Sequence, residues 1–168
     1  DISRMELKSI QREIKRVCIH EVIASILELF QIDISKKGIR VIFDKEESTQ
    51  CIKADSDEIT RLFTNLISNA IKYNREQGTI TIKLSLSDDY LLTTIKDSGI
   101  GLKPEEKNKL FTEFFRAKNE KTKNISGTGL GLSIVKRIVD SYSGKIEVES
   151  DYGEGTTFKV FLPTIISN

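Results

Sequence analysis

Three glycines at alternate positions form the stretch of the chain best suited to binding a ligand. Gly127, Gly129 and Gly131 lead directly into residues 134–139, whose apolar residues have helical spacing. Glycine lets a backbone approach a ligand closely, and the first turn of a helix presents unpaired N–H groups and a positive dipole end. This combination favours binding of a phosphate chain. The alternative is an ordinary flexible turn before a helix, although a turn does not require three spaced glycines.

This glycine loop departs from the common phosphate-binding fingerprints. The dinucleotide-binding pattern requires a glycine where Leu132 stands and a strand where the polar residues 117–126 stand. The loop lacks the G-K-[ST] ending of a Walker A motif. The H-R-D and D-F-G motifs that accompany a protein-kinase glycine loop do not follow it. The rest of the chain is therefore needed to identify the loop.

A row of polar residues lies on the clearest predicted helix, residues 55–74. Asn65, Asn69 and Lys72 are spaced four and three apart, so they share one side of the helix, with Tyr73 next to them. Asparagine is an indifferent helix former, and two of them in one row either border solvent or bind a ligand. The adjacent apolar face is predicted to pack on the core and comprises Ile59, Leu62, Phe63, Leu66, Ile67 and Ala70.

An acidic residue followed by two glycines ends a predicted strand. The sequence there is Asp97-Ser98-Gly99-Ile100-Gly101. A carboxylate in this position can present a hydrogen-bond acceptor to a ligand that passes close to the glycine backbone. An Asx turn without a ligand is the alternative for an isolated motif of this kind.

Short strands and helices are predicted around these motifs. Residues 1–16 are expected to be the end of a helix, and Asp55 is expected to cap helix 55–74, with Glu58 completing a capping box. The polar residues 117–126 are expected to be mobile. The other predicted elements are helix 19–35, strands 39–43 and 51–53, the hairpin of 79–86 with 90–96, helix 105–111, a helix from the glycine loop to about residue 142, and the hairpin of 145–150 with 156–162.

The composition indicates one soluble globular domain. The chain has 168 residues, of which 38% are hydrophobic and 30% are charged, and its net charge of +1 gives no electrostatic case for nucleic acid as a partner. Cys18 and Cys51 match no metal or redox spacing and are expected to stay reduced. No apolar run is long enough to span a membrane, and no signal peptide opens the chain. The start at Asp1 indicates a fragment. The sequence leaves open a membrane anchor upstream in the parent protein.

Five motifs occur in an order that resembles the catalytic, ATP-binding domain of bacterial sensor histidine kinases, which belongs to the GHKL superfamily with gyrase and heat-shock chaperones. Each motif is weak alone, but five in this order, over about residues 20–163, are specific. They are residues 65–73, 97–101, 111–116, 127–131 and 155–158. The resemblance implies an α/β (α+β) two-layer sandwich, in which helices cover one face of a mixed, mostly antiparallel sheet and ATP lies between the helices and a lid.

The resemblance implies an adenine site around Asp97. The Asp97 carboxylate would accept a hydrogen bond from the adenine amino group, and Thr156 would support this contact, partly through water. Gly99 and Gly101 would let the backbone pass the nucleotide. Tyr73 would lie against the adenine or the ribose.

The resemblance also implies a phosphate site. Asn69 would ligate Mg²⁺ through its side-chain carbonyl, Asn65 would support the phosphate and metal side, and Lys72 would contact phosphates as a point charge. Arg116 would clamp the γ-phosphate, and residues 117–126 would form the lid. The loop residues expected to give backbone N–H groups to the phosphates are Gly127, Thr128, Gly129, Leu130, Gly131 and Leu132.

Asn65 and Arg116 are the expected catalytic residues. Hydrolytic members of the superfamily carry a glutamate at the position of Asn65, where it activates water, and an amide has no comparable basic lone pair. The sequence therefore favours phosphoryl transfer over ATP hydrolysis. His20 is the only histidine, but the proline expected after it is absent, and strand 39–43 follows too soon for a second hairpin helix. We therefore interpret His20 as a surface residue.

The expected function is that of a histidine kinase domain. Residues 1–16 resemble the end of the dimerisation and phosphotransfer helix, and residues 17–168 would form the catalytic domain. This cytoplasmic domain would transfer the γ-phosphoryl group of ATP to a histidine upstream of the chain, within a homodimer, for relay to a response regulator. A nucleotide-sensing module without transfer activity and a GHKL-type serine kinase or ATPase are the alternatives.

Overall fold

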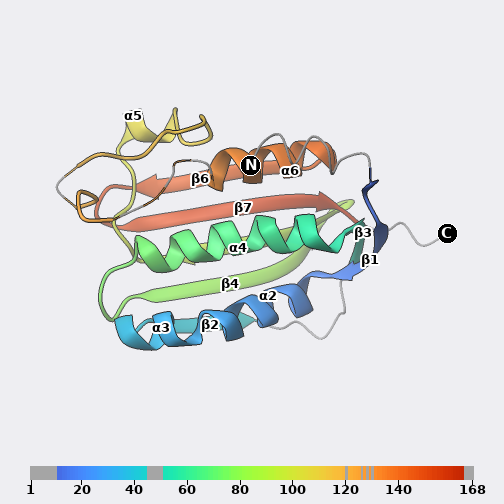
Figure 1. The fold of residues 1–168 in the computed structure, drawn as a ribbon, viewed down its shortest axis with the longest axis horizontal. Coiled ribbons are helices and arrows are strands. Elements are labelled where there is room, and N and C mark those ends of the chain that lie inside the picture. The colour runs from blue at the N-terminus through green and yellow to red at the C-terminus, as the bar shows by residue number, and fades with distance from the viewer. Residues whose placement is uncertain are drawn as a thin grey trace.

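A five-stranded sheet forms the centre of the molecule, and helices cover one of its faces (Figure 1). Among its strands only β2 and β4 are parallel, and the other neighbours are antiparallel. The predicted two-layer α/β sandwich with a mixed, mostly antiparallel sheet is thereby confirmed. The order across the sheet is β2 (Arg40–Asp44), β4 (Thr79–Ser87), β5 (Tyr90–Asp97), β7 (Gly155–Pro163) and β6 (Lys145–Asp151). The computed structural model describes residues 11–44, 51–119, 121–125, 127, 129 and 131–164.

The helical layer packs its apolar faces on the sheet, with α4 across the middle (Figure 1). Apolar residues alternate along β4 and β5 because one face of each strand meets the helices. All six residues of the apolar face predicted for α4 are buried. The predicted helix 19–35 is two helices that meet at Phe30. The helices are α2 (Ile19–Leu29), α3 (Gln31–Lys37), α4 (Ser56–Lys72), the short α5 (Pro104–Lys107) and α6 (Gly131–Ser141).

The start of α4 is capped by Asp55, as predicted, but the capping box is wrong. The Asp55 side chain accepts hydrogen bonds from the backbone N–H groups of Asp57 and Glu58. The Glu58 carboxylate, however, bonds to the Tyr142 hydroxyl and to Arg12 instead of returning to the Asp55 backbone. The Asp55 N–H donates to the Tyr142 hydroxyl at 2.9 Å. Tyr142 therefore occupies the position between Asp55 and Glu58, and its burial, with the bond to Glu58, raises its pKa to about 12.

A strand stands near the start of the described chain, where the sequence predicted a helix. Residues 14–18 form strand β1 (Ile14–Cys18), which pairs antiparallel with β3 (Cys51–Asp55) in a separate two-stranded sheet. The predicted helix over residues 1–16 is thus wrong for residues 14–16, and residues 1–10 lie outside the described part of the chain. Pairing with β3 decides the conformation here, because β-branched Ile14 and Val17 suit a paired strand and Val17 is buried in it.

Cys18 and Cys51 are joined by a disulfide bond, so the expectation of reduced cysteines is wrong. The two residues stand directly opposite each other in the register of β1 and β3, with their Cα atoms 4.0 Å apart. Residues that are 33 positions apart in sequence meet only because the strands pair. Cysteine spacing alone therefore could not reveal the bond.

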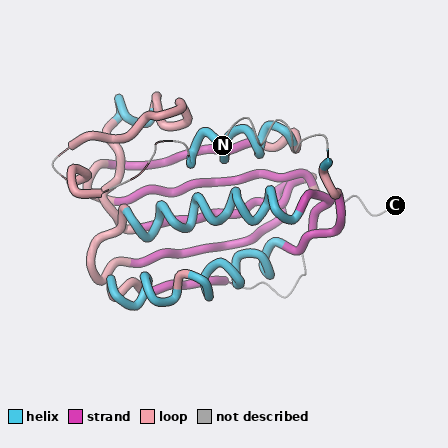
Figure 2. The backbone as a smooth tube through the Cα atoms, in the orientation of Figure 1, coloured by secondary structure: helices cyan, strands magenta, loops and turns pink. Residues whose placement is uncertain are grey.

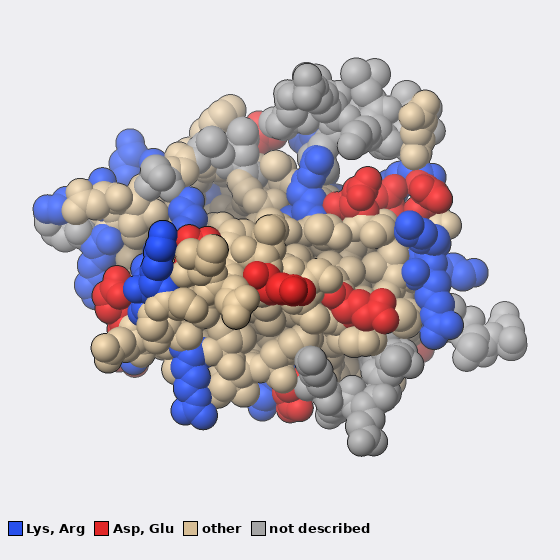
Figure 3. All heavy atoms as spheres, turned by 60° about the horizontal axis from the view of Figure 1, so that its bottom comes forward, with Lys and Arg blue, Asp and Glu red and all other residues tan. Residues whose placement is uncertain are grey.

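No helix in the described part of the chain is both long enough and apolar enough to cross a membrane. On the face that Figure 3 shows, basic and acidic side chains are interspersed around a broad uncharged area. This mixture agrees with the small net charge of the chain.

Candidate nucleotide-binding site

The loops gather at the end of the molecule where α4 finishes, at the left of Figure 2. A cavity of about 210 Å³ lies at this end. Gly99 and Thr156 do not line it, and Thr128 and Leu130 lie outside the described residues. The predicted site residues that line the cavity are Asn65, Asn69, Lys72, Tyr73, Asp97, Gly101, Arg116, Gly127, Gly129, Gly131 and Leu132.

Asp97 lies at the end of β5 with only 7% of its surface exposed. Its Oδ1 accepts hydrogen bonds from the backbone N–H groups of Gly99, at 2.9 Å, and Thr156, at 3.2 Å. No described residue bonds to its second oxygen, Oδ2. Burial raises the pKa of Asp97 to about 6, although the two amides partly oppose this shift. One carboxylate oxygen is therefore fixed by the backbone, and the other remains available to a ligand in the cavity.

The two glycines after Asp97 are required by contacts within the protein. A Cβ on Gly99 would lie 2.1 Å from the Tyr73 carbonyl oxygen. A Cβ on Gly101, which has φ of +71°, would lie 2.0 Å from the Asp151 carbonyl oxygen. The first glycine brings the Asp97 loop against the end of α4, and the second brings it against the turn between β6 and β7. The backbones around the cavity are thus packed directly against each other.

Thr156 reaches Asp97 through its backbone, and its hydroxyl bonds to Ser150. The Thr156 Oγ1 lies 2.9 Å from the Ser150 Oγ, which also donates to the Gly155 carbonyl and accepts from the Leu102 N–H. Ser150 therefore ties β6, β7 and the loop after Asp97 together. The sequence contains no motif for this serine, and only its register opposite Thr156 in the β6–β7 hairpin could have suggested it.

The end of α4 is held by a lysine that sequence reasoning missed. The Lys37 ammonium donates to the carbonyls of Ile71 and Lys72, both at 2.8 Å, and of Asn74, at 3.1 Å. These are carbonyls at the C-terminal end of the helix, which a cation stabilises. Burial lowers the pKa of Lys37, and Glu76 partly opposes this shift. Lys37 thus helps to fix the position of the last turn of α4, which carries Lys72.

Asn74 connects the end of α4 to the loop after Asp97. It is 5% exposed, and its Oδ1 accepts hydrogen bonds from the Arg75 N–H and the Ser98 hydroxyl. Its Nδ2 donates to the Thr79 carbonyl at 3.0 Å. All of its buried polar atoms therefore have partners, as buried amides require.

Asn65 marks the contact between α4 and the start of α6. Its Nδ2 donates to the Arg61 carbonyl at 2.9 Å, and its Oδ1 lies 2.9 Å from the point that a Cβ on Gly131 would occupy. A larger residue at Gly131 would therefore displace the amide. The first turn of α6 therefore lies beside the polar row of α4.

Two cations flank the glycine loop. The Lys72 Nζ and the Arg116 Nε lie 3.3 and 3.6 Å from the point that a Cβ on Gly127 would occupy. Burial lowers the pKa of Lys72, and the charge of Arg116 lowers it further. Arg116 donates to the Ile125 carbonyl, but its buried Nε has no hydrogen-bond partner in the part of the chain that the structure describes. Among the described residues, neither cation forms an ion pair with an acidic side chain.

A protein-family model settles the class of the domain. Residues 54–166 match the family described as histidine kinase-, DNA gyrase B- and HSP90-like ATPases. The chain belongs to this family. The resemblance inferred from the five motifs is confirmed, and the chain is an ATPase-type, ATP-binding domain.

The relatives of this ATPase domain include sensor histidine kinases. Sensor histidine kinase ZraS of Salmonella typhi is 35% identical over 90% of this chain and 32% of its own length. WalK of Bacillus subtilis is 30% identical over 96% of this chain and 27% of its own length. The chain thus spans about a third of these curated relatives.

Solved structures of histidine kinases share the fold. The catalytic domain of the histidine kinase ThkA has a TM-score of 0.78 and 31% identity, covering 90% of this chain and 95% of its own. The mycobacterial sensor histidine kinase MprB has a TM-score of 0.77 and 27% identity, with 90% and 98% covered. The ATPase domain is therefore of the histidine-kinase catalytic type.

The described part of the predicted lid is a turn tied to its surroundings. The Asn119 Nδ2 donates to Glu106 Oε1 at 3.2 Å, and the Thr122 hydroxyl donates to the Ala117 carbonyl at 2.5 Å. The Lys121 ammonium lies 4.4 Å from the centre of the Tyr152 ring, in the turn between β6 and β7. The motion of the segment stays a prediction.

Proposed function

We propose that this chain is the catalytic domain of a sensor histidine kinase, which binds Mg²⁺ and ATP and transfers the γ-phosphoryl group to a histidine. One observation carries the proposal: Lys72 and Arg116 lie without acidic partners, among the described residues, beside a glycine loop, while the Asp97 carboxylate lines the same cavity. ATP carries an amino donor on its base and a polyanion at its other end. The amino group of the base would match the Asp97 carboxylate, and the phosphates would match Lys72 and Arg116.

The adenine would be recognised by Asp97. Its Oδ1 is held by two backbone amides, so Oδ2 has a defined orientation and can accept the hydrogen bond of the adenine amino group. A guanine oxygen in that place would face the carboxylate as a second acceptor. Tyr73 and the apolar lining, which includes Leu110 and Phe158, would contact the flat faces of the base.

The phosphates would lie between α4, α6 and Arg116. Asn69 would hold Mg²⁺ through its amide oxygen, which suits an ion that keeps water ligands and shares phosphate oxygens. The described residues contain no cluster of three or more His, Cys, Asp or Glu side chains that could hold a metal, so the ion would depend on the nucleotide. When bound, Mg²⁺ neutralises phosphate charge. Lys72 would supply a further charge, and the buried Nε of Arg116 would gain an acceptor.

Asn65 favours transfer to a nucleophile over hydrolysis. An amide accepts no proton near neutral pH, and the Asn65 Nδ2 is already committed to the Arg61 carbonyl. No general base for water is therefore supplied at this position. The work left to the domain is to position the phosphates and to neutralise their charge, as in phosphoryl transfer generally.

The acceptor and the partners lie outside this chain in the proposal. The phosphorylated histidine would belong to a helical dimerisation domain upstream, within a homodimer, and a response regulator would receive the group. The parent protein would carry the signal-sensing part, with or without a membrane anchor.

Labelling with γ-³²P-ATP tests the proposal. We expect the parent protein to acquire an acid-labile, base-stable label, as phosphohistidine does, and expect the chain alone to bind ATP with little release of phosphate. Arg116→Ala should slow labelling. ATP binding without any labelling of the parent would indicate a nucleotide-sensing module, and rapid phosphate release by the chain alone would indicate an ATPase; either result overturns the proposal.

A further inference from the structure

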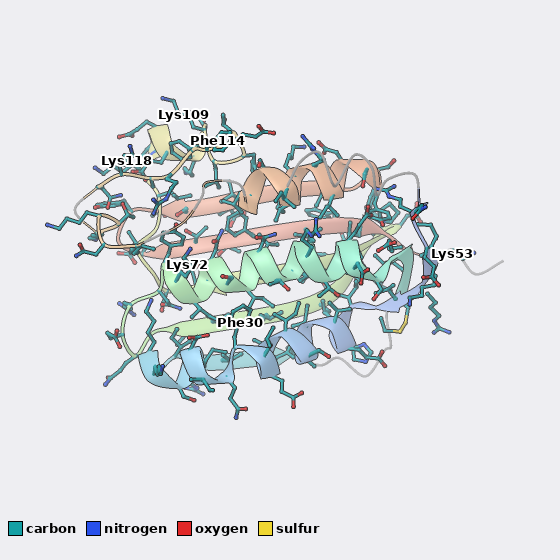
Figure 4. All side chains as sticks on the ribbon, viewed as in Figure 1. Phe30, Lys53, Lys72, Lys109, Phe114 and Lys118 are labelled. Carbon is teal, nitrogen blue, oxygen red and sulfur yellow. A yellow bond between two sulfur atoms is a disulfide. The ribbon has the colours of Figure 1, made fainter. Side chains whose placement is uncertain are left out.

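The Cys18–Cys51 bond lies at the end of the molecule opposite the ATP site (Figure 4). It joins the last residue of β1 to the first residue of β3, and these residues pair directly in the register of the two strands. Both cysteines are half-buried, so part of each residue is open to solvent. The bond is therefore not enclosed in the hydrophobic core.

The residues beside the bond favour thiol chemistry. Side chains two positions apart on a strand point to the same side. Arg16 and Lys53 are such neighbours of Cys18 and Cys51, they face each other in the register, and both are exposed. Figure 4 shows Lys53 at the same end as the bond. Cations near a cysteine stabilise the thiolate, which is both the attacking and the leaving group in disulfide exchange.

The bond also holds the segment by which the chain enters the domain. This entry segment comprises residues 12–18. Its first two residues contact the ends of α4 and α6, and its last five form β1. The Arg12 Nε donates to Glu58 Oε1 of α4 at 3.0 Å, and its NH2 group donates to the Ser141 hydroxyl of α6 at 2.6 Å. The Arg12 guanidinium lies 4.9 Å from the centre of the Tyr142 ring. The Glu13 N–H donates to Asp55 Oδ2 at 3.0 Å.

The two helices that the entry segment bridges also meet at the phosphate side of the cavity. Asn65 and Asn69 belong to α4, and Gly131, which lies against Asn65, begins α6. The entry segment thus contacts one end of each helix whose other part lines the ATP site. Its attachment to the domain depends on the β1–β3 pairing, on the burial of Val17 in the core and on the few bonds made by Arg12 and Glu13.

We propose that Cys18 and Cys51 form a reversible thiol–disulfide couple, which controls how firmly the entry segment is held against α4 and α6. Its reaction partner is a small thiol and disulfide of the glutathione class. A thiolate of this class attacks one sulfur, a mixed disulfide forms, and the other cysteine leaves as a thiolate. A second small thiol then attacks the mixed disulfide, so that two electrons and two protons convert the closed bond to two cysteine thiols and release one small disulfide.

The first experiment measures the couple in the native protein. The chain is equilibrated in mixtures of glutathione and glutathione disulfide, free thiols are trapped by alkylation, and mass spectrometry counts them. We expect the closed form in excess disulfide, two free thiols in excess glutathione, and the same ratio when either form is the starting material. Reduction that occurs only in denaturant, or cysteines that never close, would overturn the proposal.

The second experiment asks what the bond controls. Hydrogen exchange of the entry segment is compared in the closed and opened forms. The amides of the exposed turn at residues 88 and 89 are the internal reference, because such amides exchange by local opening and not by global unfolding. We expect exchange in the entry segment to be about tenfold faster when the bond is open, because a local attachment is then lost, with the reference unchanged.

The double variant Cys18→Ser with Cys51→Ser is the matched control. It should exchange at the opened rate whatever the ratio of glutathione to its disulfide, and it should bind ADP as the native chain does, which shows that it folds. Equal exchange of the entry segment in the closed form, the opened form and the variant would contradict control by the bond. A redox response that persists in the variant would contradict assignment to these cysteines.

Discussion

The charged side chains at the two ends of α4 differ in whether they have partners. At the N-terminal end, Asp55 accepts hydrogen bonds from backbone amides, and Glu58 is bonded to Arg12 and Tyr142. At the C-terminal end, Lys72 and Arg116 lie close together without acidic partners among the described residues. Paired groups stabilise a fold, whereas unpaired buried groups cost stability until a ligand supplies the partner. One helix therefore has an anchoring end and a binding end.

Removal of the disulfide should give the largest effect and should affect only the anchoring end. The double variant Cys18→Ser with Cys51→Ser is expected to lose about 3–4 kcal/mol of unfolding free energy, because a bond between residues 33 apart restricts the unfolded chain. Urea denaturation without reductant measures this loss, and native chain with reductant is the control. A loss below about 1 kcal/mol, or weaker ATP binding, would contradict the division between the two ends.

Asp97→Asn should give the largest effect at the binding end. The variant keeps an acceptor for the amides of Gly99 and Thr156, but an NH2 group replaces Oδ2 and meets the adenine amino group as a second donor. We expect ATP binding to weaken by about 1.5–3 kcal/mol. Calorimetry measures this change, and Asp57→Asn, at an exposed acid near the start of α4, is the control. Equal affinity in the variant and the native chain would remove Asp97 from the adenine site.

Arg116→Ala should weaken the binding of ATP much more than the binding of ADP. Loss of a charge-assisted hydrogen bond to the γ-phosphate is expected to weaken ATP binding by about tenfold and to change ADP binding little. The control is Arg40→Ala, at an exposed arginine on the edge strand β2. If ADP and ATP lose affinity equally, Arg116 contacts the inner phosphates instead. If neither changes, the two-cation site is wrong.

Acid should weaken nucleotide binding through Asp97. Because burial raises the pKa of Asp97 to about 6, the carboxylate that we propose as the acceptor of the adenine hydrogen bond is lost as pH falls through that value. We expect ATP affinity to be about fourfold lower at about pH 5.5 than at about pH 7, after subtraction of the profile of Asp97→Asn, which corrects for phosphate titration. An identical profile in the native chain and the variant would contradict this role.

The raised pKa of Asp97 affects the stability of the nucleotide-free protein in the opposite direction: acid increases stability while it weakens binding. The folded Asp97 binds a proton more tightly than the unfolded one, so its ionised form destabilises the fold above pH 6. This contribution to stability is regained as pH falls from above 6 towards the unfolded pKa. The binding end therefore gains stability under the conditions in which it loses its ligand.

The binding end was largely predictable from the sequence. Asn65, Asn69 and Lys72 are neighbours on one helix, and Asp97 is followed by its glycines, so local spacing alone groups each motif. The order of the motifs also predicted the α/β sandwich, which the sheet order confirms. The division of the chain at residues 16 and 17, and the roles given to individual site residues, stay predictions.

The anchoring end was not predictable in the same way. Tyr142 and Glu58 are 84 residues apart, and Cys18 and Cys51 become partners only when β1 pairs with β3. Lys37 at the other end of α4 also acts across a tertiary contact, on the carbonyls of Ile71 and Lys72. Motif spacing carries no information on such pairs. For the same reason, the sequence predicted the cap by Asp55 correctly but not the partners of Glu58, which are Tyr142 and Arg12.

A crystal structure of the chain with a non-hydrolysable ATP analogue and Mg²⁺ tests the binding end most directly. We predict the adenine amino group within hydrogen-bond distance of Asp97 Oδ2, the γ-phosphate beside Arg116 and the ion beside Asn69. Adenine bound away from Asp97, or phosphates bound away from the glycine loop and the two cations, would contradict the assignment of the ATP site.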